Sequence, residues 1–215
     1  MIKTLFNKIL DILFPRNKAE KQLDIISAEE LYSKAPKTTH PDKNIMIVFD
    51  YNDKLIRQAI WSLKFRKNKR LAKIFGQILY DEILENLFEM KTFSNFKEPI
   101  LIPIPLSKQR FRERGFNQSE LIAKEIYDLN REVFNFENKA LIKIKNTSPQ
   151  SRSKNKKERL ENLKGCFTVS NAHKIRNRNI ILIDDVTTTG ATLAEAKRVL
   201  KKYGAKKIIS LVVAH

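Results

Sequence analysis

With 215 residues, of which 42% are hydrophobic, the chain can bury one ordinary core with appendages, and no run of about 18 apolar residues is present to cross a membrane. The single cysteine, Cys166, excludes an internal disulfide and a zinc site built from cysteines, and it suits the reducing cytoplasm. The net charge of +18 favours polyanionic partners such as phosphorylated metabolites or nucleic acid, although the Lys-, Asn- and Ile-rich composition also fits the bias of an AT-rich genome.

Residues 1–43 are predicted to form an N-terminal amphipathic helix followed by a linker. Apolar residues fall at helical spacing from Met1 to Phe14, and Pro15 ends the pattern. We expect the apolar stripe to pack on the protein or on a partner, because its polar face carries few basic residues for a membrane surface. Residues 15–43 are polar and contain further prolines, so they predict a linker with little structure of its own.

Residues 44–215 are predicted to form one α/β domain. We expect strands at residues 45–50, 100–102, 167–169, 180–183 and 207–214, and helices at 53–65, 70–90, 119–129 and 191–203. Strands that alternate with helices indicate a mostly parallel sheet with helices on both faces.

The most informative stretch follows the apolar strand predicted at 180–183. Asp184 and Asp185 lie at the carboxyl end of that strand, where open α/β sheets bind their ligands. A turn and a helix start follow, and their backbone N–H groups suit a phosphate. The residues of this turn are Thr187, Thr188, Thr189, Gly190, Ala191 and Thr192. The pattern predicts a site for a ribose 5-phosphate, with the acids on the sugar hydroxyls.

Two other interpretations of this stretch are weaker. A plain turn with a helix N-cap would not need glycine, yet one of only 5 glycines in the chain lies in it. A Walker B strand would require a phosphate-binding G-x-x-x-x-G-K-[ST] loop, and the sequence has none.

Two basic segments are also candidates for binding. Residues 103–118 leave a predicted strand and carry four basic residues against the single acid Glu113. Because this loop should open on the same sheet edge as Asp184, phosphate binding by its arginines is favoured over a solvated basic turn. Residues 143–164 are highly charged and nearly free of apolar residues, which is typical of a lid or binding loop or, alternatively, of a disordered insertion.

The stretch from Asp184 to Thr192 resembles the phosphoribosyl-diphosphate signature of type I phosphoribosyltransferases. Three further stretches make the chain similar to the ComF (competence protein F, GntX-like) branch of that superfamily. They are Tyr51 to Phe65, Pro103-Ile104-Pro105 with Arg114-Gly115-Phe116-Asn117-Gln118, and Gln150 with Arg159, Asn162 and Phe167. The block from Arg114 to Gln118 is the feature that points to ComF.

The resemblance implies a role for each of these segments. Asp184 and Asp185 would be the catalytic pair on the ribose hydroxyls, and the turn after them would bind the 5-phosphate. The implied pyrophosphate loop contains Pro105, Lys108, Arg110, Arg112, Arg114, Gly115, Asn117 and Gln118, and the implied flexible loop contains Gln150, Arg152, Arg159 and Asn162. Mg²⁺ would bridge ligand oxygens and keep most of its waters, with no protein ligand assigned.

The implied function is binding of 5-phosphoribosyl 1-diphosphate with Mg²⁺, transfer of the phosphoribosyl group to an unknown nitrogen nucleophile, and a cytoplasmic role in competence and DNA uptake. The alternative is a non-catalytic module that binds a sugar phosphate or single-stranded DNA. Typical ComF proteins carry a cysteine-rich zinc finger after a Leu-Phe-Pro stretch; Leu13-Phe14-Pro15 is present, but no cysteine follows it, so no zinc is expected. Trp61 and Phe65 are available for stacking over the base side, although we expect both to pack in the core.

Overall fold

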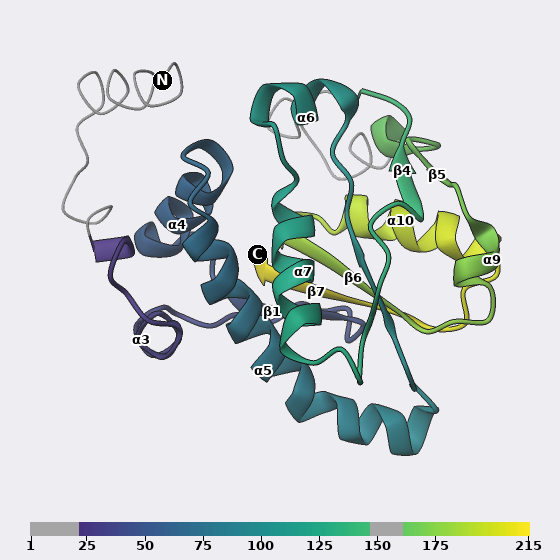
Figure 1. The fold of residues 1–215 in the computed structure, drawn as a ribbon, viewed down its shortest axis with the longest axis horizontal. Helices are drawn as coiled ribbons and strands as arrows, with labels where there is room; N and C mark the ends of the chain where they lie inside the picture. Colours follow the sequence, from purple (N-terminus) through teal and green to yellow (C-terminus); the bar gives the residue numbers. More distant parts are fainter. Residues whose placement is uncertain (1–21, 147–160) are drawn as a thin grey trace.

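A computed structural model describes residues 22–146 and 161–215 (Figure 1). Its main sheet has five parallel strands in the order β1-β7-β6-β2-β3. These strands are β1 (Ile45–Phe49), β7 (Ile208–Ala214), β6 (Ile180–Val186), β2 (Ile100–Pro103) and β3 (Asn135–Phe136). A separate antiparallel pair joins β4 (Leu141–Lys143) to β5 (Phe167–Val169). The expected mostly parallel sheet is confirmed, and the strand at 167–169 lies in this pair instead.

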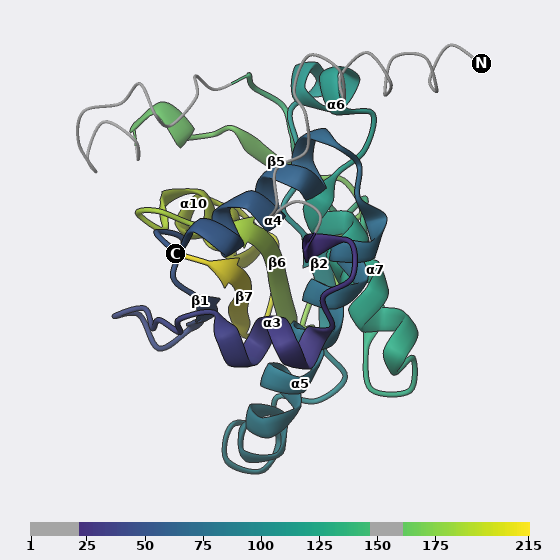
Figure 2. The ribbon, with the colours of Figure 1, turned by 90° about the vertical axis from the view of Figure 1, so that its left-hand side faces the viewer.

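Helices cover both faces of the sheet (Figures 1 and 2). One face packs on α4 (Lys54–Phe65), α5 (Lys69–Ser94) and α7 (Gln118–Leu129), and the other on α10 (Ala191–Lys202) and the β4–β5 pair. The buried strand β6 serves both cores, because Ile181 and Ile183 belong to the first and Ile180 and Leu182 to the second. The arrangement confirms the expected α/β architecture, a mostly parallel sheet with helices on both faces.

The contact between α5 and α7 depends on a glycine. A Cβ atom added at Gly76 would lie 2.5 Å from the Cβ of Glu125 on α7. A glycine is therefore required for the two helices to approach this closely. The contact matters for function because α7 begins beside the carboxyl end of β6.

The region before the sheet differs from the predicted linker. Residues 22–43 contain α3 (Ala28–Lys34), which begins at its N-cap Ser27, and Leu31 of this helix is fully buried. Arg70 on α5 donates hydrogen bonds to the carbonyls of Leu23, at 3.0 Å, and Ile26. The expectation of little structure is wrong for this part, because it is attached to the core by four buried apolar residues, Leu23, Ile26, Leu31 and Ala35. The helix predicted at 1–14 lies outside the described residues.

Two short helices were missed by sequence analysis. Helix α6 (Lys108–Arg114) occupies the middle of the segment predicted as a loop, and α9 (Ala172–Ile175) follows β5. Helix α6 has no buried residue, so it carries no apolar periodicity, and its ends are formed by the N-cap Ser107 and the left-handed Gly115. In the part of the chain that the structure describes, no helix is both long and apolar enough to span a membrane.

Candidate functional site

The two acids at the end of β6 are buried and each meets a side chain from a different helix. Asp184 and Asp185 are 8% and 7% exposed. Asp184 Oδ1 accepts a hydrogen bond from the Ser119 hydroxyl on α7 at 2.9 Å. Asp185 Oδ2 forms an ion pair with Lys64 Nζ on α4 at 2.8 Å. The pair is thus fixed by both helices that lie over this end of the sheet.

The environment of Asp184 changes its ionisation. Burial is the main cause and the neighbouring Asp185 charge the second, and together they raise the pKa of Asp184 to about 7. The Ser119 hydrogen bond and the Lys64 charge act in the opposite direction. Functional sites often contain a carboxyl group that lines a cavity and titrates near neutral pH.

The acids line a cavity of about 200 Å³ whose other walls are largely basic or hydroxylic. The polar residues around it are Lys64, Ser107, Arg110, Arg114, Gln118, Ser119, Lys143, Asp184, Asp185, Thr188 and Thr192. Four of these side chains are cationic and come from three separate segments of the chain. The cavity is therefore suited to an anion that also carries hydroxyl groups.

The turn after the acids leaves donors free for a ligand. Gly190 is the N-cap of α10 with φ of 71°, and no side chain caps the first turn of that helix. The Thr189 hydroxyl is buried and has no hydrogen-bond partner among the described residues. The Thr187 N–H, by contrast, is bonded to the Ala214 carbonyl at 3.0 Å, which ties the turn to β7. An uncapped helix N-terminus beside an unused hydroxyl matches the predicted phosphate site.

The predicted pyrophosphate segment is divided by α6. Arg110 and Arg114, one helical turn apart, line the cavity with the acids. Lys108 and Arg112 line a second groove of about 660 Å³ together with Phe111. All four basic residues were predicted to lie in one loop. The helix instead directs Arg110 and Arg114 to one face and Lys108 and Arg112 to another, because residues two positions apart lie on different faces of a helix.

Gln118 has one side-chain atom with a hydrogen-bond partner and one without. It is 1% exposed, and its Oε1 accepts a hydrogen bond from Arg114 at 3.0 Å. Its Nε2 makes no hydrogen bond within the described part of the chain, although it is buried at the cavity wall. An unused buried donor costs about 1–3 kcal/mol unless a ligand satisfies it.

The remaining predicted residues of the segment have supporting positions. Pro105 lines the cavity. Gly115 ends α6 with φ of 77°, which is a conformation that favours glycine. Asn117 donates from Nδ2 to the Ile104 carbonyl at 3.0 Å and accepts from the Ser119 N–H at 3.2 Å, so it holds the start of α7.

Four polar residues of the cavity were not predicted as site residues: Lys64, Ser107, Ser119 and Lys143. Lys64 and Ser119 belong to helices predicted at 53–65 and 119–129, and no local pattern indicates that they meet the acids. Lys143 ends the short strand β4, and burial lowers its pKa. Trp61 and Phe65 were expected in the core, but they are 44% and 53% exposed, because the buried face of α4 is formed by other residues.

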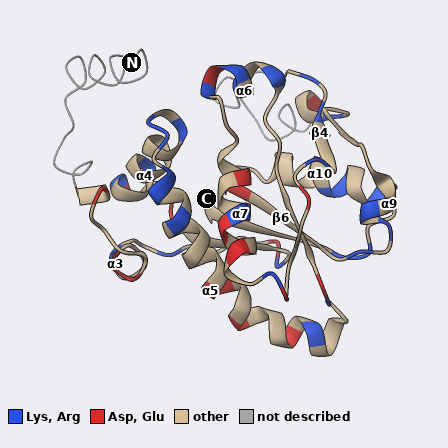
Figure 3. Ribbon diagram, viewed as in Figure 1, with Lys and Arg blue, Asp and Glu red and all other residues tan. Residues whose placement is uncertain are grey.

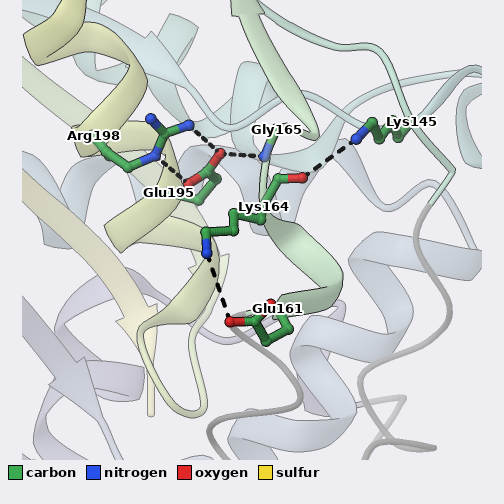
Figure 4. Close-up of polar contacts among 6 residues, drawn as sticks. All are labelled: Lys145, Glu161, Lys164, Gly165, Glu195 and Arg198. Carbon is green, nitrogen blue, oxygen red and sulfur yellow. Dashed lines mark hydrogen bonds and ion pairs between the residues drawn. The ribbon is translucent and has the colours of Figure 1, made fainter.

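Of the residues predicted in the flexible loop, Gln150, Arg152 and Arg159 lie outside the described residues, and Asn162 is described but does not line the cavity. The base of that segment is anchored to α10 (Figure 4). The Gly165 N–H donates to Glu195 Oε1 at 2.7 Å, and Arg198 Nε lies 2.7 Å from Glu195 Oε2. The segment therefore rejoins the domain next to α10.

The side chains of the cavity suit a Mg²⁺ ion that is bound mainly by the ligand. Among residues 22–146 and 161–215, no group of three or more His, Cys, Asp or Glu side chains could hold a metal ion. Mg²⁺ often binds through one or two carboxylates and the phosphates of a substrate. Asp184 and Asp185 are the carboxylates at this cavity, so the site fits an ion held mainly by the ligand.

The sequence of this chain is similar to those of known proteins. Residues 120–215 match the family model described as phosphoribosyl transferase domain. Competence protein ComFC of Bacillus subtilis (strain 168) is 36% identical over 76% of this chain. Competence protein F of Haemophilus influenzae is 28% identical over 78% of it, and DNA utilization protein YhgH of Escherichia coli (strain K12) is 28% identical over 78%.

The chain spans 60% of the length of the Bacillus relative, 71% of the Haemophilus relative and 70% of the Escherichia relative. A solved structure of the allosteric regulatory enzyme of purine biosynthesis aligns with 66% of this chain and 25% of that chain, at 13% identity and a TM-score of 0.39.

Proposed function

This chain belongs to the ComF family of phosphoribosyltransferase-fold proteins, and from that premise we propose that it binds 5-phosphoribosyl 1-diphosphate at the Asp184–Asp185 cavity. We further propose that it transfers the phosphoribosyl group to a nitrogen nucleophile. The observation that carries the proposal is the buried acid pair between an uncapped helix N-terminus and a basic wall formed by Arg110 and Arg114. This arrangement supports a ligand with vicinal hydroxyls between two phosphate groups.

The proposed roles follow from the positions of the donors and acceptors. Asp184 and Asp185 accept hydrogen bonds from the ribose hydroxyls. The turn at residues 187–192 binds the 5-phosphate through its backbone N–H groups. Arg110 and Arg114 bind the pyrophosphate, with the unused Nε2 of Gln118 as a further donor.

The proposed reaction is displacement at the anomeric carbon. A bond forms from the acceptor nitrogen to this carbon, and the bond to the pyrophosphate oxygen breaks with its electron pair leaving on that oxygen. The proton that the nitrogen gives up is taken by the released pyrophosphate. The arginines assist by stabilising the charge that develops on the leaving group. Asp184 and Asp185 would hold Mg²⁺ together with the ligand, and the ion would supply further neutralisation of that charge.

The curated relatives are named for competence and DNA utilization. We therefore propose that the protein acts in the cytoplasm during DNA uptake, with the competence machinery as its partner. Loss of transformation on deletion of its gene, restored by the wild-type gene, is the expected result. Undiminished transformation in a competent host would contradict this role.

Release of pyrophosphate tests the enzymatic proposal. The full chain should release pyrophosphate from phosphoribosyl diphosphate when a panel of nitrogen bases and amines is supplied, and the double variant Asp184→Asn/Asp185→Asn should not. Asp128→Asn is the control, because Asp128 is an acid on the same helix as Ser119 but pairs with Lys124 and Arg131 away from the cavity. Release no faster than that of the double variant with every acceptor would contradict catalysis.

The charge of +18 favours a second candidate, a non-catalytic module that binds the sugar phosphate or single-stranded DNA. Lys and Arg residues are visible on α4, α6 and α9 in Figure 3. Binding to a single strand through phosphates predicts an affinity that falls steeply with salt concentration. A flat salt profile in a titration with an oligonucleotide would exclude binding to single-stranded DNA through its phosphates.

A further inference from the structure

Two of the three histidines of the chain lie side by side. The ring centroids of His40 and His215 are 5.2 Å apart, and the ring planes are inclined by 72°. His40 lies in the segment between α3 and β1, and His215 directly follows β7. Because β7 and β6 are parallel neighbours, this histidine pair lies at the same edge of the sheet as the turn after β6.

His215 is bonded to the first residue of that turn. Its Nδ1 lies 3.3 Å from the Thr187 carbonyl oxygen, and because a carbonyl only accepts, the imidazole nitrogen is the donor. The Thr187 N–H donates to the Ala214 carbonyl at 3.0 Å. Both polar backbone groups of Thr187 are therefore bonded to the end of β7, and His215 helps to fix the start of the turn.

His40 faces the other end of the turn. A Cβ atom added at Gly190 would lie 3.7 Å from His40 Nε2 and 3.9 Å from its Cε1. Gly190 is the N-cap of α10, so the imidazole lies beside the uncapped first turn of that helix. The histidine pair therefore contacts the turn proposed to bind phosphate at both of its ends.

The hydrogen bonding of His40 determines which of its nitrogens can donate. Nδ1 accepts a hydrogen bond from the Asp42 N–H at 3.0 Å. A neutral imidazole has one accepting nitrogen and one that carries hydrogen, so Nε2 is the donor. No described residue accepts a hydrogen bond from Nε2. The donor on the side of Gly190 is thus available to a ligand.

The surroundings of His40 keep its ring neutral at pH 7. Burial is the main cause that lowers its pKa below the ordinary value of 6.5, and the His215 imidazole acts in the same direction. Asp42 raises the pKa of His40 and Lys197 on α10 lowers it, and these two residues form an ion pair at 3.6 Å. A phosphate dianion placed beside the ring would favour its protonated form.

We propose that His40 is a further binding residue for the phosphate group at the turn of residues 187–192, and that it takes up a proton from solvent when this phosphate binds. Its Nε2–H donates to a phosphate oxygen, while His215 holds Thr187 in place. Because the bound state carries the extra proton, the phosphate is bound more tightly as the pH falls. This inference rests on the proposed function, since it adds a residue and a pH dependence to the same site.

Calorimetry of the two ligand fragments tests the role of His40. The full chain is titrated with ribose 5-phosphate and, separately, with pyrophosphate in the presence of Mg²⁺ between pH 6 and pH 8. In His40→Asn the amide oxygen can still accept from the Asp42 N–H, but the Nε2 donor and the site of protonation are lost. We expect the affinity for ribose 5-phosphate to fall about tenfold at pH 6 and about threefold at pH 8, with that for pyrophosphate unchanged.

The comparison of variants separates His40 from the other titrating groups. Asp184 and the phosphate itself titrate in both proteins, so the ratio of wild-type to variant affinity reports on His40 alone. His40→Gln replaces the ring by an uncharged donor, so it should recover most of the affinity at pH 8 but not the gain at pH 6. His173→Ala, which changes an exposed histidine of α9, should keep the wild-type affinity and pH profile.

The outcomes distinguish this inference from the proposed function. Ribose 5-phosphate that binds with the same pH profile to the wild type and to His40→Asn overturns the role of His40 alone. Equal losses for ribose 5-phosphate and pyrophosphate also overturn it, because His40 would then act through the stability of the fold. Failure of the wild type to bind phosphoribosyl diphosphate and ribose 5-phosphate overturns the proposed function, and the role of His40 with it.

Discussion

At the scale of single residues, Asp184 is the group whose ionisation depends most on the fold. Its carboxyl group is buried at the end of β6 beside a second acid, and its pKa is raised to about 7. In the unfolded chain the same group titrates near pH 4. The folded state therefore binds a proton more tightly than the unfolded state, and stability falls as the pH rises through the interval between these values.

This difference predicts the behaviour of Asp184→Asn. The amide keeps an oxygen that can accept from Ser119 but carries no charge. At pH 8 the variant should unfold with a free energy about 1–3 kcal/mol higher than that of the wild type, because the wild type bears the full cost of the buried charge. The gain should shrink as the pH falls and approach zero only near pH 4, below which Asp184 is protonated in the folded and the unfolded chain alike.

Urea denaturation across this pH range checks the prediction. Ser119→Ala is a useful comparison, since it removes the hydrogen bond and should destabilise the protein at pH 8 more than at pH 5. A gain for Asp184→Asn that does not vary with pH would show that the carboxyl group does not titrate as described.

The division of the arginines between two faces of α6 predicts different effects of their substitution on ligand binding. Arg114→Ala should weaken the binding of phosphoribosyl diphosphate by about 10- to 100-fold, which corresponds to the loss of one hydrogen bond to a charged group. Arg112→Ala, on the face that lines the second groove, should change it by less than about threefold. Calorimetry measures both values, and equal losses would mean that α6 does not divide the basic residues.

At the scale of elements, the turn before α10 depends on Gly190. Its φ of 71° is unfavourable for a residue with a Cβ, and a Cβ there would lie 3.7 Å from His40 Nε2. Gly190→Ala should cost about 1–2 kcal/mol of stability and also weaken ligand binding, because the N–H groups of the turn shift. Denaturation and calorimetry measure these effects separately.

Gly204 offers the control for this change. Its φ is 93°, and it lies beside Arg176, away from the cavity. Gly204→Ala should therefore destabilise the protein to a similar extent and leave the ligand affinity unchanged. Loss of affinity in both variants would attribute the effect to general destabilisation instead of to the turn.

The packing of α3 on the core predicts that this helix contributes to the stability of the domain. Leu31 is fully buried between α3 and the core, so Leu31→Ala should lower the free energy of unfolding by about 2–5 kcal/mol in a single transition. Urea denaturation measures this loss. A cost below about 1 kcal/mol is the result expected of a loosely attached linker, and it would contradict the packing seen for α3.

Some of these elements could be predicted from the sequence alone, and others could not. The apolar run of β6 and the acids after it are local signals, and they predicted the strand, the turn and the helix that follow. Helix α6 has no buried side chain and α3 is only 7 residues long, so neither has the periodicity that reveals a helix. The partnership of Lys64 with Asp185 joins residues far apart in the chain, and no local pattern contains it.

At the scale of the whole molecule, the strand order brings the functional segments together. Strand β6 lies between β7 and β2, so the turn after β6 and the segment after β2 open side by side at the same edge. Parallel strands ensure this placement, because all of their carboxyl ends lie on one edge. Helices α4 and α7 then add Lys64 and Ser119 from above the sheet.

The same arrangement explains why a highly basic chain buries two acids. Lys64, Arg110, Arg114 and Lys143 surround the cavity, so the local field favours an anion even with the acid pair present. In the proposed function, the acids leave room for hydroxyl groups between the two segments proposed to bind phosphate. The proposed function therefore requires one ligand that reaches both the turn at 187–192 and the wall formed by α6.

Competition calorimetry tests this requirement most directly. The full chain is titrated with phosphoribosyl diphosphate in the presence of Mg²⁺, and again after saturation with ribose 5-phosphate or with pyrophosphate. We predict that phosphoribosyl diphosphate binds with one-to-one stoichiometry and that each fragment weakens its binding, since the fragments occupy the two halves of the site. Absence of binding, or binding that neither fragment affects, would contradict the assignment of the Asp184–Asp185 cavity.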